Sequence, residues 1–121
     1  MIPELRAIRD DEAEVIRAAL EMAPVAHVGE AAIAAISGLR VIGRCECGCA
    51  SVNFDSSESG QRAKPIADGT AKTLRGGDVG IIVWGCADAI TGLEIYDVGA
   101  GDNDLLLPVP TSISPWDRQP K

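Results

Sequence analysis

Apolar residues recur every three or four positions near the start of the chain, which is the pattern of an amphipathic helix. Within residues 10–23 the repeat is formed by Val15, Ile16, Ala19, Leu20 and Ala23. Acidic residues fill the first turn, where they complement the helix dipole, and Pro24 ends the helix. Pro3 also fits the first turn of a longer helix, so the start stays open. A second helix is predicted for residues 29–37, because Val28, Ala32, Ile33 and Ile36 share a face.

From residue 39 onward the pattern changes to apolar–polar alternation and short apolar runs, which are typical of strands. The predicted strands are residues 39–45, 50–54, 64–74, 79–84 and 91–97. The most apolar run is 79–84, which predicts a central strand buried on both faces with Trp84 in the core. Leu93 and Ile95 alternate with polar residues and are expected to point inward. Only six residues separate these last two strands, which favours an antiparallel hairpin.

Helices and strands are segregated along the chain, which predicts an α+β fold. We expect two N-terminal helices packed on one face of a mostly antiparallel sheet of four to five strands. The 121 residues fit a single domain, residues 1–121, large enough to fold without a metal or disulfides. Its parts are a helical region (about 3–38), a sheet region (about 39–98) and an irregular, proline-rich C-terminal tail (99–121).

The chain is acidic, with 11 Lys+Arg against 18 Asp+Glu and a formal net charge of −7. This balance argues against nucleic-acid binding, because such surfaces need clustered basic residues. No apolar run approaches the roughly 20 residues of a membrane-spanning helix, so we expect no membrane partner. The first residues lack the basic start and apolar core of a signal peptide, which predicts a cytoplasmic location. A basic protein partner remains compatible with this charge.

The clearest acidic patch is predicted near the C-terminus, where residues 76–121 hold seven acids and two bases. Asp97, Asp102 and Asp104 follow one another on a glycine-containing stretch, and Glu94 precedes them on the last predicted strand. These four residues are the candidate partner-binding site, since acidic patches steer docking onto basic proteins. One concrete form is an immunity protein that neutralises a basic toxin. Acidic loops that only keep the domain soluble are the alternative, and calcium is disfavoured because the spacing differs from that of an EF-hand.

Three cysteines within five residues, Cys45, Cys47 and Cys49, are the most unusual local feature, and Cys86 ends the central strand. In a three-residue hairpin loop Cys45 and Cys49 would face each other, which allows a reversible disulfide. Cys45, Cys47 and Cys49, joined by Cys86, are a candidate zinc site, although the spacing differs from the usual Cys-x-x-Cys knuckles. Packing as small apolar side chains is the simplest interpretation. A zinc or thiol-redox module is therefore the alternative function, with no cofactor as the main expectation.

Catalytic motifs are missing from the sequence. His27 is the only histidine, so multi-histidine metal sites are excluded. The nucleophile elbow, the phosphate-binding loop and the zinc-protease motif are all missing. We therefore predict a domain that is not an enzyme, and the sequence leaves its oligomeric state open.

Two segments carry a resemblance to a group of small uncharacterised bacterial proteins. The first is Leu39-Arg40-Val41-Ile42-Gly43-Arg44-Cys45-Glu46-Cys47-Gly48-Cys49-Ala50-Ser51-Val52 and the second is Leu93-Glu94-Ile95-Tyr96-Asp97. Those proteins look similar in having a helical N-terminal part, a cysteine-glycine-cysteine hairpin and a later Leu-Glu-Ile strand. The resemblance implies a small bacterial cytoplasmic domain and carries no catalytic residue with it.

Overall fold

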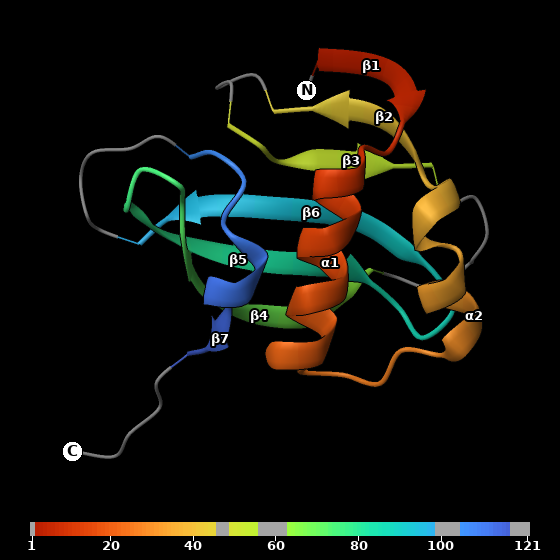
Figure 1. Ribbon diagram of the computed structural model, residues 1–121. Helices are drawn as coiled ribbons and strands as arrows, with labels where there is room; N and C mark the ends of the chain where they lie inside the picture. The colour runs from red at the N-terminus through yellow and green to blue at the C-terminus, as the bar shows by residue number, and fades with distance from the viewer. Residues whose placement is uncertain (1, 46–48, 56–62, 99–104, 117–121) are drawn as a thin grey trace.

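The computed structural model describes residues 2–45, 49–55, 63–98 and 105–116, and it confirms the α+β class. An antiparallel sheet of seven strands is crossed on one face by helix α1 (Asp10–Met22), as Figure 1 shows. The strands are β1 (Ile2–Ala7), β2 (Arg40–Arg44), β3 (Val52–Phe54), β4 (Lys64–Lys72), β5 (Asp78–Gly85), β6 (Ile90–Asp97) and β7 (Ser114–Pro115). Their order in the sheet is β1-β2-β3-β6-β5-β4-β7.

The core lies between α1 and the sheet. Ile16 and Ala19 of the predicted helical stripe are fully buried. They belong to one cluster with the inward positions of the two central strands, Val79, Ile81 and Val83 of β5 and Leu93 and Ile95 of β6. The inward direction predicted for Leu93 and Ile95 is confirmed, as is the antiparallel β5–β6 hairpin. Both predictions rest on strict side-chain periodicity, which burial on one face enforces.

The sheet has seven strands rather than four to five, because strands were missed at both edges. β1 occupies the start of the chain, where the sequence also allowed a longer helix. The inward residues of β1 are Glu4 and Arg6, so an apolar alternation is missing from its sequence. β7 lies within the tail that was predicted to be irregular, after the 3-10 helix η2 (Pro110–Ser112). Proline is tolerated in such an edge strand, where its missing N–H costs few ladder bonds.

The second helix does not cover the sheet, so the prediction of two packing helices is wrong in this part. α2 (Glu30–Ala34) is only five residues long and packs on the 3-10 helix η1 (Ile36–Gly38), to one side of α1 (Figure 1). Its N-cap residue, Gly29, donates a backbone hydrogen bond to Ala87 in the β5–β6 loop, at 2.8 Å. With three alanines among five residues, α2 has too little apolar surface to cover a sheet.

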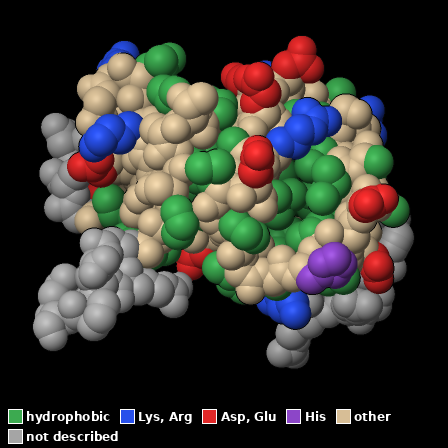
Figure 2. Space-filling view, turned by 60° about the horizontal axis from the view of Figure 1, so that its bottom comes forward, with side chains coloured by type: hydrophobic (Ala, Val, Ile, Leu, Met, Phe, Trp, Pro, Cys, Tyr) green, Lys and Arg blue, Asp and Glu red, His purple; other side chains and the backbone are tan. Residues whose placement is uncertain are grey.

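Exposed apolar side chains collect on the helical side, around the C-terminal end of α1 and α2 (Figure 2). Met22, Val25 and Ile33 are 48%, 49% and 39% exposed there. Acidic and basic side chains are dispersed around this area in Figure 2. No helix within the described ranges is long and apolar enough to cross a membrane.

Candidate functional site

The face of the sheet opposite α1 carries most of the aromatic side chains of the protein. Side chains alternate along a strand, so the residues between the core positions point to this second face. The face is called the open face below and consists of Asp68 and Thr70 on β4, Ile82 and Trp84 on β5, Glu94 and Tyr96 on β6, and Trp116 after β7. All seven are half-buried. The prediction that β5 is buried on both faces is therefore wrong, and Trp84 lies outside the core.

Asp68, Ile82 and Glu94 form one row across three neighbouring strands. Ile82 pairs with Asp68 on one side and with Glu94 on the other. Neighbouring strands lie about 4.8 Å apart, so the backbones of the two acidic residues are about 10 Å apart. The row thus places two carboxylates on either side of one apolar side chain.

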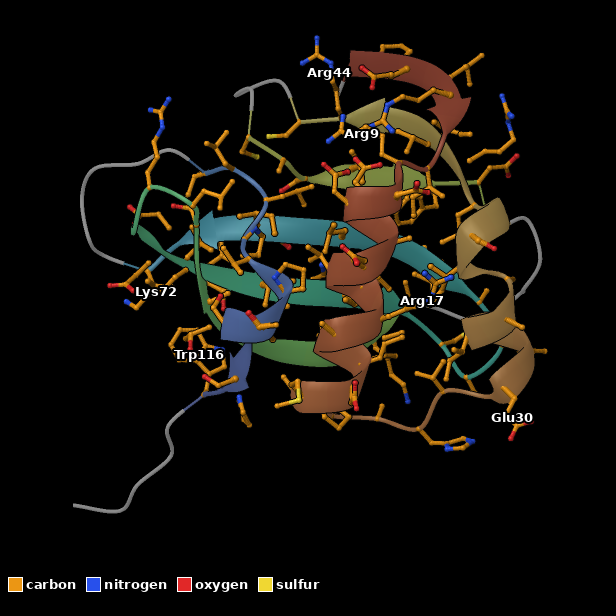
Figure 3. All side chains as sticks on the ribbon, viewed as in Figure 1. Arg9, Arg17, Glu30, Arg44, Lys72 and Trp116 are labelled. Carbon is orange, nitrogen blue, oxygen red and sulfur yellow. The ribbon has the colours of Figure 1, made fainter. Side chains whose placement is uncertain are left out.

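Asp68 is held by two aromatic donors. The Trp116 indole Nε1–H donates to Asp68 Oδ1 at 2.8 Å, and the Tyr96 hydroxyl donates a weaker bond to the same oxygen at 3.4 Å. The two rings are stacked with their centres 6.4 Å apart. Burial and the nearby Asp68 carboxylate raise the pKa of the Tyr96 hydroxyl, which keeps it protonated as a donor. In Figure 3, Trp116 lies at the β7 end of the sheet, from which its ring reaches Asp68.

Gly80 makes this arrangement of Tyr96 possible. Gly80 pairs with Tyr96 across β5 and β6, and a Cβ atom on Gly80 would lie only 2.2 Å from Cζ of the tyrosine ring. The ring therefore lies flat over the glycine and extends toward Asp68. A larger residue at position 80 would displace the ring from this position.

On the other side of Ile82, Glu94 also accepts a hydrogen bond from an aromatic donor, as Asp68 does. The Trp84 indole Nε1–H donates to Glu94 Oε1 at 3.0 Å. In both acidic residues one oxygen is fixed by an aromatic donor, while the second oxygen accepts no hydrogen bond from the described residues. Beside Trp84 lies a groove of about 400 Å³, also lined by Ile42, Asn53 and Thr91. The open face thus combines flat aromatic surface with carboxylate oxygens that are available to a ligand.

The predicted acidic patch is divided by the structure. Glu94 lies on the open face, whereas Asp97 pairs with Val79 and points to the helical side, where it is exposed. The two residues are three positions apart in β6, and an odd offset sends their side chains to opposite faces of the sheet. Asp102 and Asp104 lie outside the described residues. Asp68, which the sequence analysis missed, is the carboxylate that accompanies Glu94.

The cysteine hairpin has a different register from the one predicted. Arg44 pairs with Val52, and the Cys45 backbone N–H donates to Ser51 O at 3.2 Å, so Ser51 rather than Cys49 lies opposite Cys45. The Cys49 thiol donates to Ser51 Oγ at 3.3 Å. Cys45 and Cys49 are half-buried, and Cys47 lies outside the described residues. A disulfide across the ladder between Cys45 and Cys49 does not fit this register.

Cys86 is buried far from the other thiols. It follows Gly85, which pairs with Ile90, whereas Ser51 bonds the backbone of Ile95. Five residues along β6 correspond to about 16 Å, so Cys86 does not join a site with Cys45 and Cys49. Across the described ranges, no three His, Cys, Asp or Glu side chains come together as a possible metal site.

A cleft of about 480 Å³ lies between β1, α1 and the cysteine hairpin, and its walls carry paired charges. Arg6 makes a two-pronged salt bridge to Glu12, with both N–O distances at 2.8 Å. Glu4 accepts from Arg6 at 2.6 Å and from Arg44 at 2.9 Å. These four residues, with Arg9, are called the ion-pair network; Arg9 and Arg44 lie above the N-terminal end of α1 in Figure 3. Both carboxylates of this network are paired with arginine, so these ion pairs hold β1 to the helix. Cys49 also lines the cleft.

Glu12 is the centre of the ion-pair network. It is 1% exposed and also accepts a hydrogen bond from the Arg9 backbone N–H at 2.9 Å, which satisfies a free donor at the start of α1. Burial opposes ionisation of Glu12, but the hydrogen bonds from Arg6 and from Arg9 outweigh burial and hold its pKa below the ordinary value. The bond to Glu12 in turn raises the pKa of the Arg6 guanidinium, although burial opposes this. Glu12 is therefore ionised at neutral pH.

Comparison of the chain with family models, with curated proteins and with solved structures gives no match.

Proposed function

We propose that this protein is a non-enzymatic protein-binding domain that docks a basic protein partner on the open face of its sheet. The observation that carries the proposal is the pair of carboxylates, Asp68 and Glu94, each with one oxygen fixed by an aromatic donor and one oxygen available. Such an oxygen is preorganised to accept a hydrogen bond from a lysine or arginine of a partner.

The aromatic residues support a protein partner rather than a small cation. Tryptophan and tyrosine are enriched among the residues that dominate binding energy, because they bury large rigid surfaces at low entropic cost. Trp84, Tyr96 and Trp116 supply such surfaces beside the two carboxylates. A lysine or arginine over these rings also gains a cation–π interaction.

The net charge of −7 supports a basic partner as well. Opposite net charges raise association rates, and this effect weakens as salt screens the charges. An immunity protein bound to a basic toxin is one concrete form of this function. Glu94 is retained from the predicted acidic patch, and Asp68 joins it.

The test is a capture experiment followed by kinetics. The immobilised wild-type protein is exposed to a cell extract of its source organism, beside the Asp68→Asn/Glu94→Gln variant. Glu14→Gln/Glu21→Gln removes the same charge from exposed positions on α1 and is the matched control. We expect a basic protein that is retained by the wild type and the control and is lost from the open-face variant.

With the purified partner, the open-face variant should associate about tenfold more slowly than the wild type, since rates of related complexes vary over one to three decades. Added salt should reduce this difference. If the captured proteins and their association rates are the same for both variants, the open face is not the docking site and the proposal fails.

A further inference from the structure

The geometry of the open face also constrains the shape of its partner, an inference that rests on the function proposed above. Asp68 and Glu94 stand about 10 Å apart across the strands, as two strand spacings require. Ile82 lies between them in the same row and is half-buried, so apolar surface remains exposed there. A matching partner therefore presents two basic groups on either side of an apolar one.

A helix matches this spacing better than an extended chain. With a rise of 1.5 Å per residue, helical residues seven positions apart are separated by about 10.5 Å and lie on nearly the same face. In a strand, side chains on one face repeat at about 6.7 Å and again at about 13.4 Å. Neither distance matches the roughly 10 Å between Asp68 and Glu94. The residue three or four positions after the first basic one lies midway along the same helical face.

Aromatic rings lie on both sides of the row that Asp68, Ile82 and Glu94 form. Trp84 lies two residues from Ile82 on one side, and Gly80, with the Tyr96 ring over it, lies two residues away on the other. The distance from Trp84 to Gly80 along β5 is about 13 Å, and a helix with its side chains is about 10 to 12 Å wide. A helix laid across the strands over Ile82 would thus contact rings along both of its sides.

We propose that the open face binds a helix whose basic residues are seven positions apart, with an apolar residue at the third or fourth position between them. One basic group approaches the available oxygen of Asp68, the other approaches that of Glu94, and the apolar residue packs on Ile82. The helix axis runs across the strands, and Trp84, Tyr96 and Trp116 contact its flanks.

Two synthetic peptides of identical composition test this inference. Both are alanine-rich helices with two lysines and one leucine. In the first peptide the lysines are seven positions apart with the leucine between them, and in the second the lysines are two positions apart, which places them on nearly opposite sides of the helix. Binding is measured by titration calorimetry against the wild type, the Asp68→Asn and Glu94→Gln single variants, and the Glu14→Gln/Glu21→Gln control.

We expect the first peptide to bind the wild type and the control about tenfold more tightly than the second, which corresponds to about 1.4 kcal/mol. Either single variant should lose this preference, because each removes one of the two anchoring charges. Equal affinities for both peptides, or a preference that survives in both single variants, overturn the inference. If the peptides do not differ while the capture experiment still depends on Asp68 and Glu94, the helix inference fails and the proposed function stands.

Discussion

The ion-pair network and the open face both contain carboxylates with fixed geometry, but the two regions differ in what fixes them. Glu12 is buried and bound by the Arg6 guanidinium and the Arg9 backbone, so its charge is already compensated. Asp68 and Glu94 are half-buried and bound by neutral indole and phenol donors, which orient them without neutralising their charge. The comparison shows that the chemistry of the neighbours decides whether a carboxylate stabilises the fold or remains available to a partner.

The largest effect is expected when Glu12 is neutralised. Glu12→Gln leaves the Arg6 guanidinium without its buried counter-charge, and removal of one partner from such a pair costs about 3 kcal/mol or more. Urea denaturation at neutral pH measures this loss. Glu14→Gln on the exposed side of α1 is the control and should change the free energy of unfolding by less than about 0.5 kcal/mol. Equal stabilities of the two variants would show that the network does not hold β1 to α1.

The same network predicts an acid-sensitive fold. The pKa of Glu12 is lower in the folded state than its ordinary value, so its ionisation stabilises the protein at neutral pH. This contribution is fully present above the unfolded-state pKa of about 4.3 and is lost as the pH falls through the lower folded-state value. Stability measured between pH 7 and pH 3 should decline less steeply for Glu12→Gln than for the wild type. Parallel curves would contradict the assignment.

An intermediate effect is expected from Gly80→Ala, which leaves every charge in place. The added methyl group collides with the Tyr96 ring and should separate it from Trp116 and Asp68. Overpacking of this kind costs about 1 to 3 kcal/mol. Binding of the peptide whose lysines are seven positions apart should weaken, together with the loss of ring stacking seen in the near-ultraviolet circular dichroism spectrum. Unchanged binding would mean that the position of the rings is not needed for docking.

The smallest effect concerns the cysteines. Cys86 is 3% exposed and separated from Cys45 and Cys49, so zinc bound at the hairpin should not protect it further. Labelling with N-ethylmaleimide, followed by mass spectrometry, should show Cys86 reacting only after unfolding, at the same rate with and without added zinc. Zinc-dependent protection of Cys86 would indicate a shared metal site and would favour the alternative function, the zinc module.

Periodicity predicted the parts of the fold where one face is apolar and buried. Val15, Ile16 and Ala19 identified α1, and Leu93 and Ile95 identified β6. β1 was not predicted because its inward residues, Glu4 and Arg6, are stabilised by ion pairs rather than by apolar packing. No local pattern reports such pairing, since the partners Glu12 and Arg44 come from other elements.

The candidate site was only partly predictable for a related reason. Glu94 was identified, but the sequence grouped it with Asp97 by proximity, and strand alternation separates the two. Asp68 was missed because the inward positions of β4 beside it are small, Ala67, Gly69 and Ala71, which weakens the alternating pattern. Trp84 was placed in the core because its strand is apolar on both faces. Which face stays open depends on where α1 packs, and that is a tertiary property.

The most direct test of the central claim uses the two indole N–H groups of the protein, Trp84 and Trp116, which both bond carboxylates of the open face. Their signals are resolved in a proton–nitrogen NMR spectrum of the labelled protein, recorded during titration with the peptide whose lysines are seven positions apart. We predict that both indole signals shift in step with the backbone amides of Ile82 and Glu94, while those of α1 stay in place. Shifts confined to α1 or α2, or indole signals that do not move at saturating peptide, would contradict docking on the open face.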